Sequence, residues 1–324
     1  MLLVGSLSMF FAEVVSGAST TWFLNPEGIL ITYPLYLMHL LFLFAIGVKT
    51  GRVKIEQLYL IGMFFALYES WITKVLWAGY MESTSPGFGT FAGLAFPEFP
   101  ILVFFWHPVM SFILPILSLE ILTKKTISAH ENLLKKSTTK SIVLGVFFSI
   151  LGTFVANGNA YSLISSWLSL SGTLLIILVL YSFSKKASIL SIVPGKRGKH
   201  ALLIYLIAIY TLTFFLILPQ RIPHSPLPYI SILLTYFLAA ILLWKSTRVS
   251  VTLTYLSGEH YGPLDFTIAM LLLFISTSLS CVFPKISETV LIIAYFSLIF
   301  IGFSILILAV KNLVKYSRKY PQSL

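Results

Sequence analysis

Apolar stretches of about twenty residues recur along the whole chain and are separated by short polar connectors. Each stretch is long enough to cross about 30 Å of hydrocarbon as an α-helix. The pattern predicts ten spans, at residues 2–23, 28–47, 57–77, 100–121, 141–156, 162–182, 201–218, 229–244, 266–283 and 289–310. The first has no basic segment before it and holds Glu13 in its core, so we expect a helix of the mature protein rather than a signal peptide. The predicted fold is all-α, a polytopic transmembrane helix bundle.

The basic residues lie in alternate connectors. All but three of the 22 Lys and Arg fall at residues 49–54, 124–140, 185–199, 245–248 and 311–319. The exceptions are Lys74, Arg221 and Lys285. Because cytoplasmic loops carry the Lys/Arg excess, we predict that both termini are cytoplasmic, in the cell membrane of a prokaryote. The net charge of +11 is then expected to face anionic lipid heads, and no nucleic-acid partner is expected.

Composition excludes several classes of protein. The chain is 57% hydrophobic and 10% charged, whereas a soluble domain carries about 25% charged residues. Its single cysteine, Cys281, excludes an internal disulfide framework and a cysteine-based zinc site. No glycine-rich phosphate loop or nucleophile elbow is present, and no cofactor is expected.

Ionisable residues within the spans are concentrated in the first part of the chain. We therefore predict three parts: residues 1–123 as the bundle that carries a polar site, 124–140 as a basic cytoplasmic loop, and 141–324 as a mostly apolar bundle. The outer connector 77–99 is rich in aromatic residues and glycine, which favours a position on or in the membrane interface.

Four ionisable residues on four different spans share one depth. With a rise of about 1.5 Å per residue, Glu13 and Glu69 lie about 17 Å above the cytoplasmic boundary. His107 lies about 10 Å below the outer boundary, and His39 lies near the midplane. A carboxylate in hydrocarbon needs a partner or a water-filled cavity. The sequence thus predicts a buried Glu/His site, with Glu69, His107 and Glu13 as candidate catalytic residues.

Three further residues are candidate binding residues: His39, Ser16 and Lys74. Ser16 and Gly17 follow Glu13 on one face of its helix, which would permit close helix approach and a hydroxyl partner. Lys74 lies roughly 140° around the helix from Glu69, and snorkelling to the head groups is its competing interpretation. No metal is expected, since close ligand spacing of the H-E-x-x-H kind is lacking.

Three segments carry a resemblance to known proteins. AEVVSGASTTWFLNPEG, ALYESWITKVL and FFWHPVMSFILPILSLE together resemble a family of uncharacterised polytopic prokaryotic membrane proteins. The resemblance covers roughly residues 10 to 120 and implies a multi-pass fold without implying an activity.

The same segments are distantly similar to the CPBP- and PrsW-type intramembrane glutamate proteases, in which a glutamate and histidines activate water. This resemblance implies catalytic roles for Glu69 and, in part, for Lys74 and His107. The chain departs from the pattern at Tyr68, which stands where a first glutamate would be. The Glu-to-Lys spacing is one residue longer than in the PrsW form, and a later histidine paired with asparagine is missing.

Three functions remain open on these residues. The most specific is a membrane-embedded hydrolase acting on a peptide or lipid, because a buried carboxyl and an imidazole can activate water together. The second is a proton-coupled transporter or small-molecule carrier, since ten spans suit an inverted repeat. The third is a structural or assembly subunit, whose buried polar pairs only fix helix packing. The partner is accordingly an unknown membrane substrate or protein.

Overall fold

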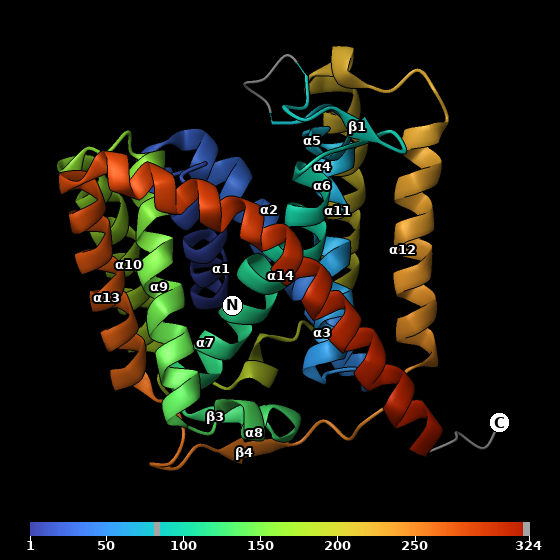
Figure 1. Ribbon diagram of the computed structural model, residues 1–324. Helices are drawn as coiled ribbons and strands as arrows, with labels where there is room; N and C mark the ends of the chain where they lie inside the picture. Colours follow the sequence, from blue (N-terminus) through green and yellow to red (C-terminus); the bar gives the residue numbers. More distant parts are fainter. Residues whose placement is uncertain (81–84, 320–324) are drawn as a thin grey trace. The chain divides into compact units, whose positions relative to one another are not determined.

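The computed structural model describes residues 1–80 and 85–319, and most of this chain is helical (Figure 1). Within the described residues, eight helices are long and apolar enough to cross a membrane. They are Gly28–Thr50, Glu98–Thr123, Thr138–Gly158, Leu163–Ser184, Lys196–Leu216, Leu227–Lys245, Pro263–Val282 and Pro284–Lys315. They coincide with the second and the fourth to tenth predicted spans. The prediction of an all-α polytopic bundle is confirmed.

The helices and strands follow one another in a regular order. The α-helices are α1 (Leu2–Met9), α2 (Tyr33–Thr50), α3 (Ile55–Phe65), α4 (Tyr68–Trp71), α5 (Val75–Ala78), α6 (Glu98–Ile101), α7 (Leu114–Thr123), α8 (Glu131–Leu134), α9 (Thr138–Gly158), α10 (Leu163–Ser184), α11 (Lys196–Leu216), α12 (Leu227–Lys245), α13 (Pro263–Val282) and α14 (Pro284–Lys319). The π-helices are η1 (Phe10–Val14), η3 (Gly28–Thr32) and η4 (Leu102–Ile113). The 3₁₀ turns are η2 (Trp22–Leu24), η5 (Ser128–His130), η6 (Ile189–Ile192) and η7 (Pro219–Arg221). The strands are β1 (Thr90–Phe91), β2 (Leu94–Ala95), β3 (Lys125–Ile127) and β4 (Leu253–Tyr255).

The first predicted span ends earlier than expected. Helix α1 and η1 reach only Val14, where the prediction extended the helix to residue 23. Gly17 adopts φ +85°, a left-handed conformation that ends a helix. The apolar pattern alone did not show this stop, because Ala18 and the following residues remain compatible with a helix.

The chain folds into two compact units. Unit 1 contains Met1–Leu37, Leu114–Val193 and Val251–Tyr295, and unit 2 contains Met38–Ile113, Pro194–Ser250 and Phe296–Leu324. Each is therefore assembled from segments far apart in the sequence. The predicted three-part division by polar content remains a prediction.

In unit 1, α9, α10 and α13 lie side by side, and α9 packs closely on α13 (Figure 1). Small residues allow this approach: a Cβ added at Gly152 would lie 2.4 Å from the Ser276 Oγ. Gly17 likewise meets Gly158, since a Cβ added at Gly17 would lie 2.3 Å from the Gly158 Cα. The close approach predicted for the Ser16–Gly17 face is thus present.

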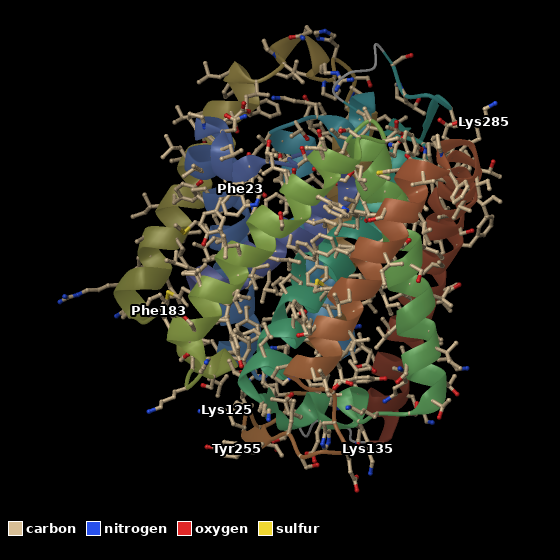
Figure 2. The ribbon with its side chains drawn as sticks, turned by 90° about the vertical axis from the view of Figure 1, so that its left-hand side faces the viewer. Phe23, Lys125, Lys135, Phe183, Tyr255 and Lys285 are labelled. Atoms are coloured by element: carbon tan, nitrogen blue, oxygen red, sulfur yellow. The ribbon has the colours of Figure 1, made fainter. Side chains whose placement is uncertain are left out.

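One end of unit 1 carries its basic connector. Strands β3 and β4 pair antiparallel there, with Lys125 opposite Tyr255. Figure 2 shows Lys125, Lys135 and Tyr255 together at this end and Lys285 at the opposite end. Lys135 forms an ion pair of 3.0 Å with Glu259, and its ammonium holds the pKa of that exposed carboxyl below its ordinary value. This separation of Lys285 from the other basic residues is the one that the charge pattern predicts.

In unit 2, α3 packs on η4 and α12 packs on α3. Cationic side chains close the ends of its helices. The Arg52 guanidinium donates to the Leu243 and Trp244 carbonyls at the end of α12, at 2.7 and 2.8 Å. Arg221 donates to the carbonyls of residues 78–80, at 2.9 to 3.0 Å, at the end of α5. The last carbonyls of a helix are otherwise unsatisfied and carry partial negative charge, so a cation is favourable at both positions.

Candidate functional site

The third predicted span, 57–77, is not one continuous helix, and this part of the prediction is wrong. Helix α3 ends at Phe65, α4 occupies a single turn, and α5 begins at Val75. The turn after α3 tightens, because the Leu67 N–H donates to the Phe64 carbonyl three residues back. Lys74 then adopts φ +62° and interrupts the helix a second time. Glu69 therefore lies on a short helical turn between two breaks, a setting tolerated at membrane depth only where protein surrounds it.

Glu69 and His107 come together inside unit 2. The Glu69 Oε1 lies 3.5 Å from the His107 Nε2, and the two residues are 8% and 1% exposed. The distance is within ion-pair range but longer than the 2.7–3.2 Å typical of a hydrogen bond. Accordingly, the His107 Nε2 has no hydrogen-bond partner in the described part of the chain.

The far side of each group is anchored by a hydroxyl four residues away. The Thr73 Oγ1 donates to the Glu69 Oε2 at 2.5 Å. The Ser111 Oγ lies 3.0 Å from the His107 Nδ1. These anchors direct Glu69 Oε1 and His107 Nε2 toward each other. Sequence reasoning had not assigned either hydroxyl a role beside its partner, although the spacing of four residues is the signal that finds both.

His107 lies on η4, a π-helix that contains Pro108. Proline removes a backbone donor, and π-helical turns occur often at functional sites. The Tyr59 hydroxyl donates to the Phe104 carbonyl at 2.7 Å. Proline and this hydroxyl thus account locally for the departure from α-helical hydrogen bonding.

Aromatic rings join His107 to His39. Phe65 is stacked on His107 with a ring separation of 5.8 Å and lies 5.0 Å from His39. Tyr68 is in edge contact with His107 at 5.1 Å and lies 5.8 Å from His39. The His39 Nε2 is hydrogen-bonded to the Tyr210 hydroxyl at 2.8 Å. Glu69, His107 and His39 are therefore members of one cluster, held together by Phe65 and Tyr68.

Glu13 belongs to unit 1 and has its own partners there. The Tyr36 hydroxyl donates to the Glu13 Oε1 at 2.5 Å. The Ser16 Oγ donates to the backbone carbonyl of Glu13 at 3.1 Å. Glu13 lies on η1, so it too is placed on a π-helical turn.

Lys74 is fully buried and closes the end of α11. Its Nζ donates to the Thr213 carbonyl at 3.1 Å, to the Ile217 carbonyl and, within its own segment, to the Ile72 carbonyl at 3.0 Å. It also lies 5.3 Å from the centre of the Phe214 ring, a cation–π distance. The snorkelling interpretation is wrong, because the last carbonyls of a helix attract the ammonium more effectively than a distant head group.

A second buried Glu–His pair escaped the sequence reasoning, which noted Glu120 alone. The His130 Nδ1 lies 3.0 Å from both Glu120 carboxylate oxygens. Glu120 also accepts from the Thr126 hydroxyl at 2.8 Å and from the Ile127 N–H at 3.1 Å. Both acid and imidazole are 0% exposed. This pair fastens the basic connector to α7, and each of its carboxylate oxygens is hydrogen-bonded.

Metal binding has little basis in the side chains. Across residues 1–80 and 85–319, no group of three or more His, Cys, Asp and Glu is placed to hold an ion. The cluster around Glu69 instead combines one carboxylate, two imidazoles and several hydroxyls. Chemically, such a set can accept, donate and relay protons.

Comparison with known proteins places the chain in a family. An uncharacterized protein of Archaeoglobus fulgidus is 42% identical over 123 residues, which is 37% of this chain and 37% of the relative. The chain thus matches little more than a third of that relative's length. No solved structure matches the chain. A family model described as "Uncharacterized membrane protein family" matches residues 2–318, so the chain belongs to this family of integral membrane proteins.

Proposed function

We propose that the protein is a membrane-embedded hydrolase, with Glu69 as general base and His107 as its partner. The observation that carries the proposal is the 3.5 Å approach of Glu69 Oε1 to His107 Nε2, with the opposite atoms anchored by Thr73 and Ser111. A water oxygen about 2.8 Å from both facing atoms would complete a triangle with hydrogen-bond geometry. The site is then ready to bind the water that it activates.

The reaction uses one water molecule. Glu69 accepts a proton from that water, and the hydroxide adds to the carbonyl carbon of an ester or amide. The bond from this carbon to the leaving oxygen or nitrogen then breaks, and the proton held at Glu69 passes through His107 to the leaving group. General acid–base catalysis of this kind contributes about 10²–10⁴-fold in rate.

The test compares two buried glutamates that each face a histidine. We would reconstitute the wild type, Glu69→Gln and Glu120→Gln, and offer a long-chain fatty ester and a membrane-spanning peptide. Glu69→Gln should lower hydrolysis by at least about 10²-fold at unchanged folding. Glu120→Gln should lower thermal stability but leave the rate per folded molecule unchanged. Equal rates in wild type and Glu69→Gln would overturn the proposal.

A proton-coupled carrier is the second candidate, and the interrupted segment α3–α5 favours it. Broken helices at membrane depth often form the binding sites of transporters. Glu69 would then take up and release a proton as the segment moves. In vesicles carrying an internal pH dye, this reading expects Glu69-dependent proton movement without hydrolysis. If Glu69→Gln changes only stability, a structural or assembly role takes the place of both.

We place the protein in the cell membrane of a prokaryote with both termini in the cytoplasm. The support is the alternation of basic connectors together with the position of Lys285 opposite Lys125 and Lys135 in unit 1 (Figure 2). In this orientation the basic end faces anionic lipid heads.

A further inference from the structure

Unit 2 contains a cavity of about 480 Å³ between α2, α3, α11 and α12. This volume is in the range of about 300–1,000 Å³ that holds small-molecule ligands. The cavity runs along α2 from His39 to Thr50, eleven residues or roughly 17 Å of helix. It is therefore long and narrow, with room for an extended chain.

The wall of the cavity is almost entirely apolar between its two ends. Phe42, Leu43 and Ile46 of α2 face Leu203 and Leu206 of α11 across it. Ile46 and Leu203 are 38% and 40% exposed, on helices expected to meet lipid. Thus the cavity can be entered from the hydrocarbon of the bilayer, where an apolar chain already resides.

The two ends differ in what they offer. At one end, the Arg52 guanidinium is committed to the Leu243 and Trp244 carbonyls, so its main role is to close α12. At the other end, the Tyr210 hydroxyl pairs with the His39 Nε2 at 2.8 Å. A hydroxyl in such a pair retains a lone pair that can accept from a ligand. The His39 end is neutral and polar, which suits an uncharged group.

The polar end adjoins the proposed catalytic pair. Phe65 and Tyr68 contact both His39 and His107. Tyr236 lies one helical turn beyond Ala240 of the cavity wall, and its ring is 5.6 Å from that of Phe64, another wall residue. The buried Tyr236 hydroxyl has no hydrogen-bond partner within the described chain. Hydrogen-bonding capacity thus accumulates at the end of the cavity nearest to Glu69.

Unit 1 has an apolar cavity of similar volume, about 530 Å³, and it differs in this respect. The hydroxyls in its wall are committed to the backbone of α9: Ser149 donates to the Gly145 carbonyl, Thr153 to Ile150, and Ser276 to Ser149. It therefore offers little polar specificity, and it serves as an internal comparison.

We infer that the unit 2 cavity binds the hydrocarbon chain of an uncharged membrane amphiphile, whose oxygen-bearing end lies at His39 and Tyr210. As an assignment of substrate class, the inference rests on the proposed hydrolase. As an assignment of a lipid site, it stands on the cavity alone. A phosphate or carboxylate head is disfavoured, because no uncommitted cation faces the inner end among the cavity's wall residues.

The experiment uses the full chain in nanodiscs and a photoactivatable hexadecanol, with the labelled peptides mapped by mass spectrometry. Labelling should fall on α2 and α11 peptides of the cavity wall. Ile46→Trp, and separately Ala240→Phe, should fill the cavity and lower this labelling about tenfold, which corresponds to about 1.4 kcal/mol. Ile204→Trp is the matched control, since Ile204 is also an exposed isoleucine on a wall helix but lies outside the cavity.

Two further comparisons separate the lipid site from the reaction. Glu69→Gln should retain labelling even where it abolishes hydrolysis, so loss of hydrolysis with labelling intact supports both proposals. His39→Phe should reduce the preference for hexadecanol over hexadecane as a competitor. Labelling unchanged by Ile46→Trp and Ala240→Phe, or stronger competition by hexadecyl phosphate than by hexadecanol, would overturn the inference. Intact labelling with a Glu69→Gln variant that hydrolyses normally would remove the hydrolase and keep the lipid site.

Discussion

The Glu69 Oε1 and the His107 Nε2 face each other across 3.5 Å in unit 2, each with its other polar atom held by a hydroxyl. Glu120 and His130 in unit 1 approach to 3.0 Å, and both oxygens of that carboxylate are hydrogen-bonded. The same two residue types therefore form a closed pair in one unit and an open pair in the other. This difference separates a structural role from a chemical one.

Glu120→Gln should destabilise the protein by about 1–3 kcal/mol, because the amide cannot accept all the hydrogen bonds now made to the carboxylate. Glu69→Gln should cost less, since Thr73 can still donate to the amide oxygen. Thermal unfolding in detergent, followed by circular dichroism, measures both. A larger loss for Glu69→Gln than for Glu120→Gln would contradict the distinction between the open and closed pairs.

Lys74→Met should lower stability by up to about 2 kcal/mol, the upper range for a cation at a helix C-terminus. The variant leaves the carbonyls of residues 213 and 217 without their donor and keeps the side-chain length. Lys285→Met is the control, because Lys285 is exposed and such substitutions usually change stability by less than about 0.5 kcal/mol. Equal melting temperatures for the two variants would argue against the capping role.

Gly17→Ala should destabilise unit 1 by about 1–3 kcal/mol, because the added methyl meets the Gly158 backbone. The left-handed φ of +85° adds strain to the same substitution. Gly195→Ala is the matched control, since nothing lies within 4 Å of a Cβ added there. The melting temperatures of the two variants test this contact, and a neutral Gly17→Ala would show that the two backbones can separate at no cost.

The orientation can be tested in a Cys281→Ser background. A cysteine replacing Lys285 should react with a membrane-impermeant maleimide added to intact cells, and one replacing Lys135 should react only after permeabilisation. The reason is the retention of Lys- and Arg-rich connectors on the cytoplasmic side. Reaction of both from outside, or the reverse pattern, would contradict cytoplasmic termini.

The apolar pattern by itself determined the fold class and the position of most membrane helices. A run of about twenty apolar residues has few alternatives to a spanning helix, because an unpaired backbone group in hydrocarbon costs several kcal/mol. It did not determine where a helix breaks at Gly17 or Lys74, since each break depends on contacts from distant parts of the chain. Lys74 is held in its left-handed conformation with its ammonium on carbonyls about 140 residues away.

Depth along each span correctly suggested that Glu69, His107 and His39 could meet, because helical rise is nearly constant. Which groups face one another depends on helix rotation and packing, which a single sequence does not specify. Two basic residues outside the charge alternation, Lys74 and Arg221, illustrate the limit: both close helix ends in unit 2. The sequence determined which polar groups enter the membrane, and tertiary packing decided which of them are satisfied and which remain open for chemistry.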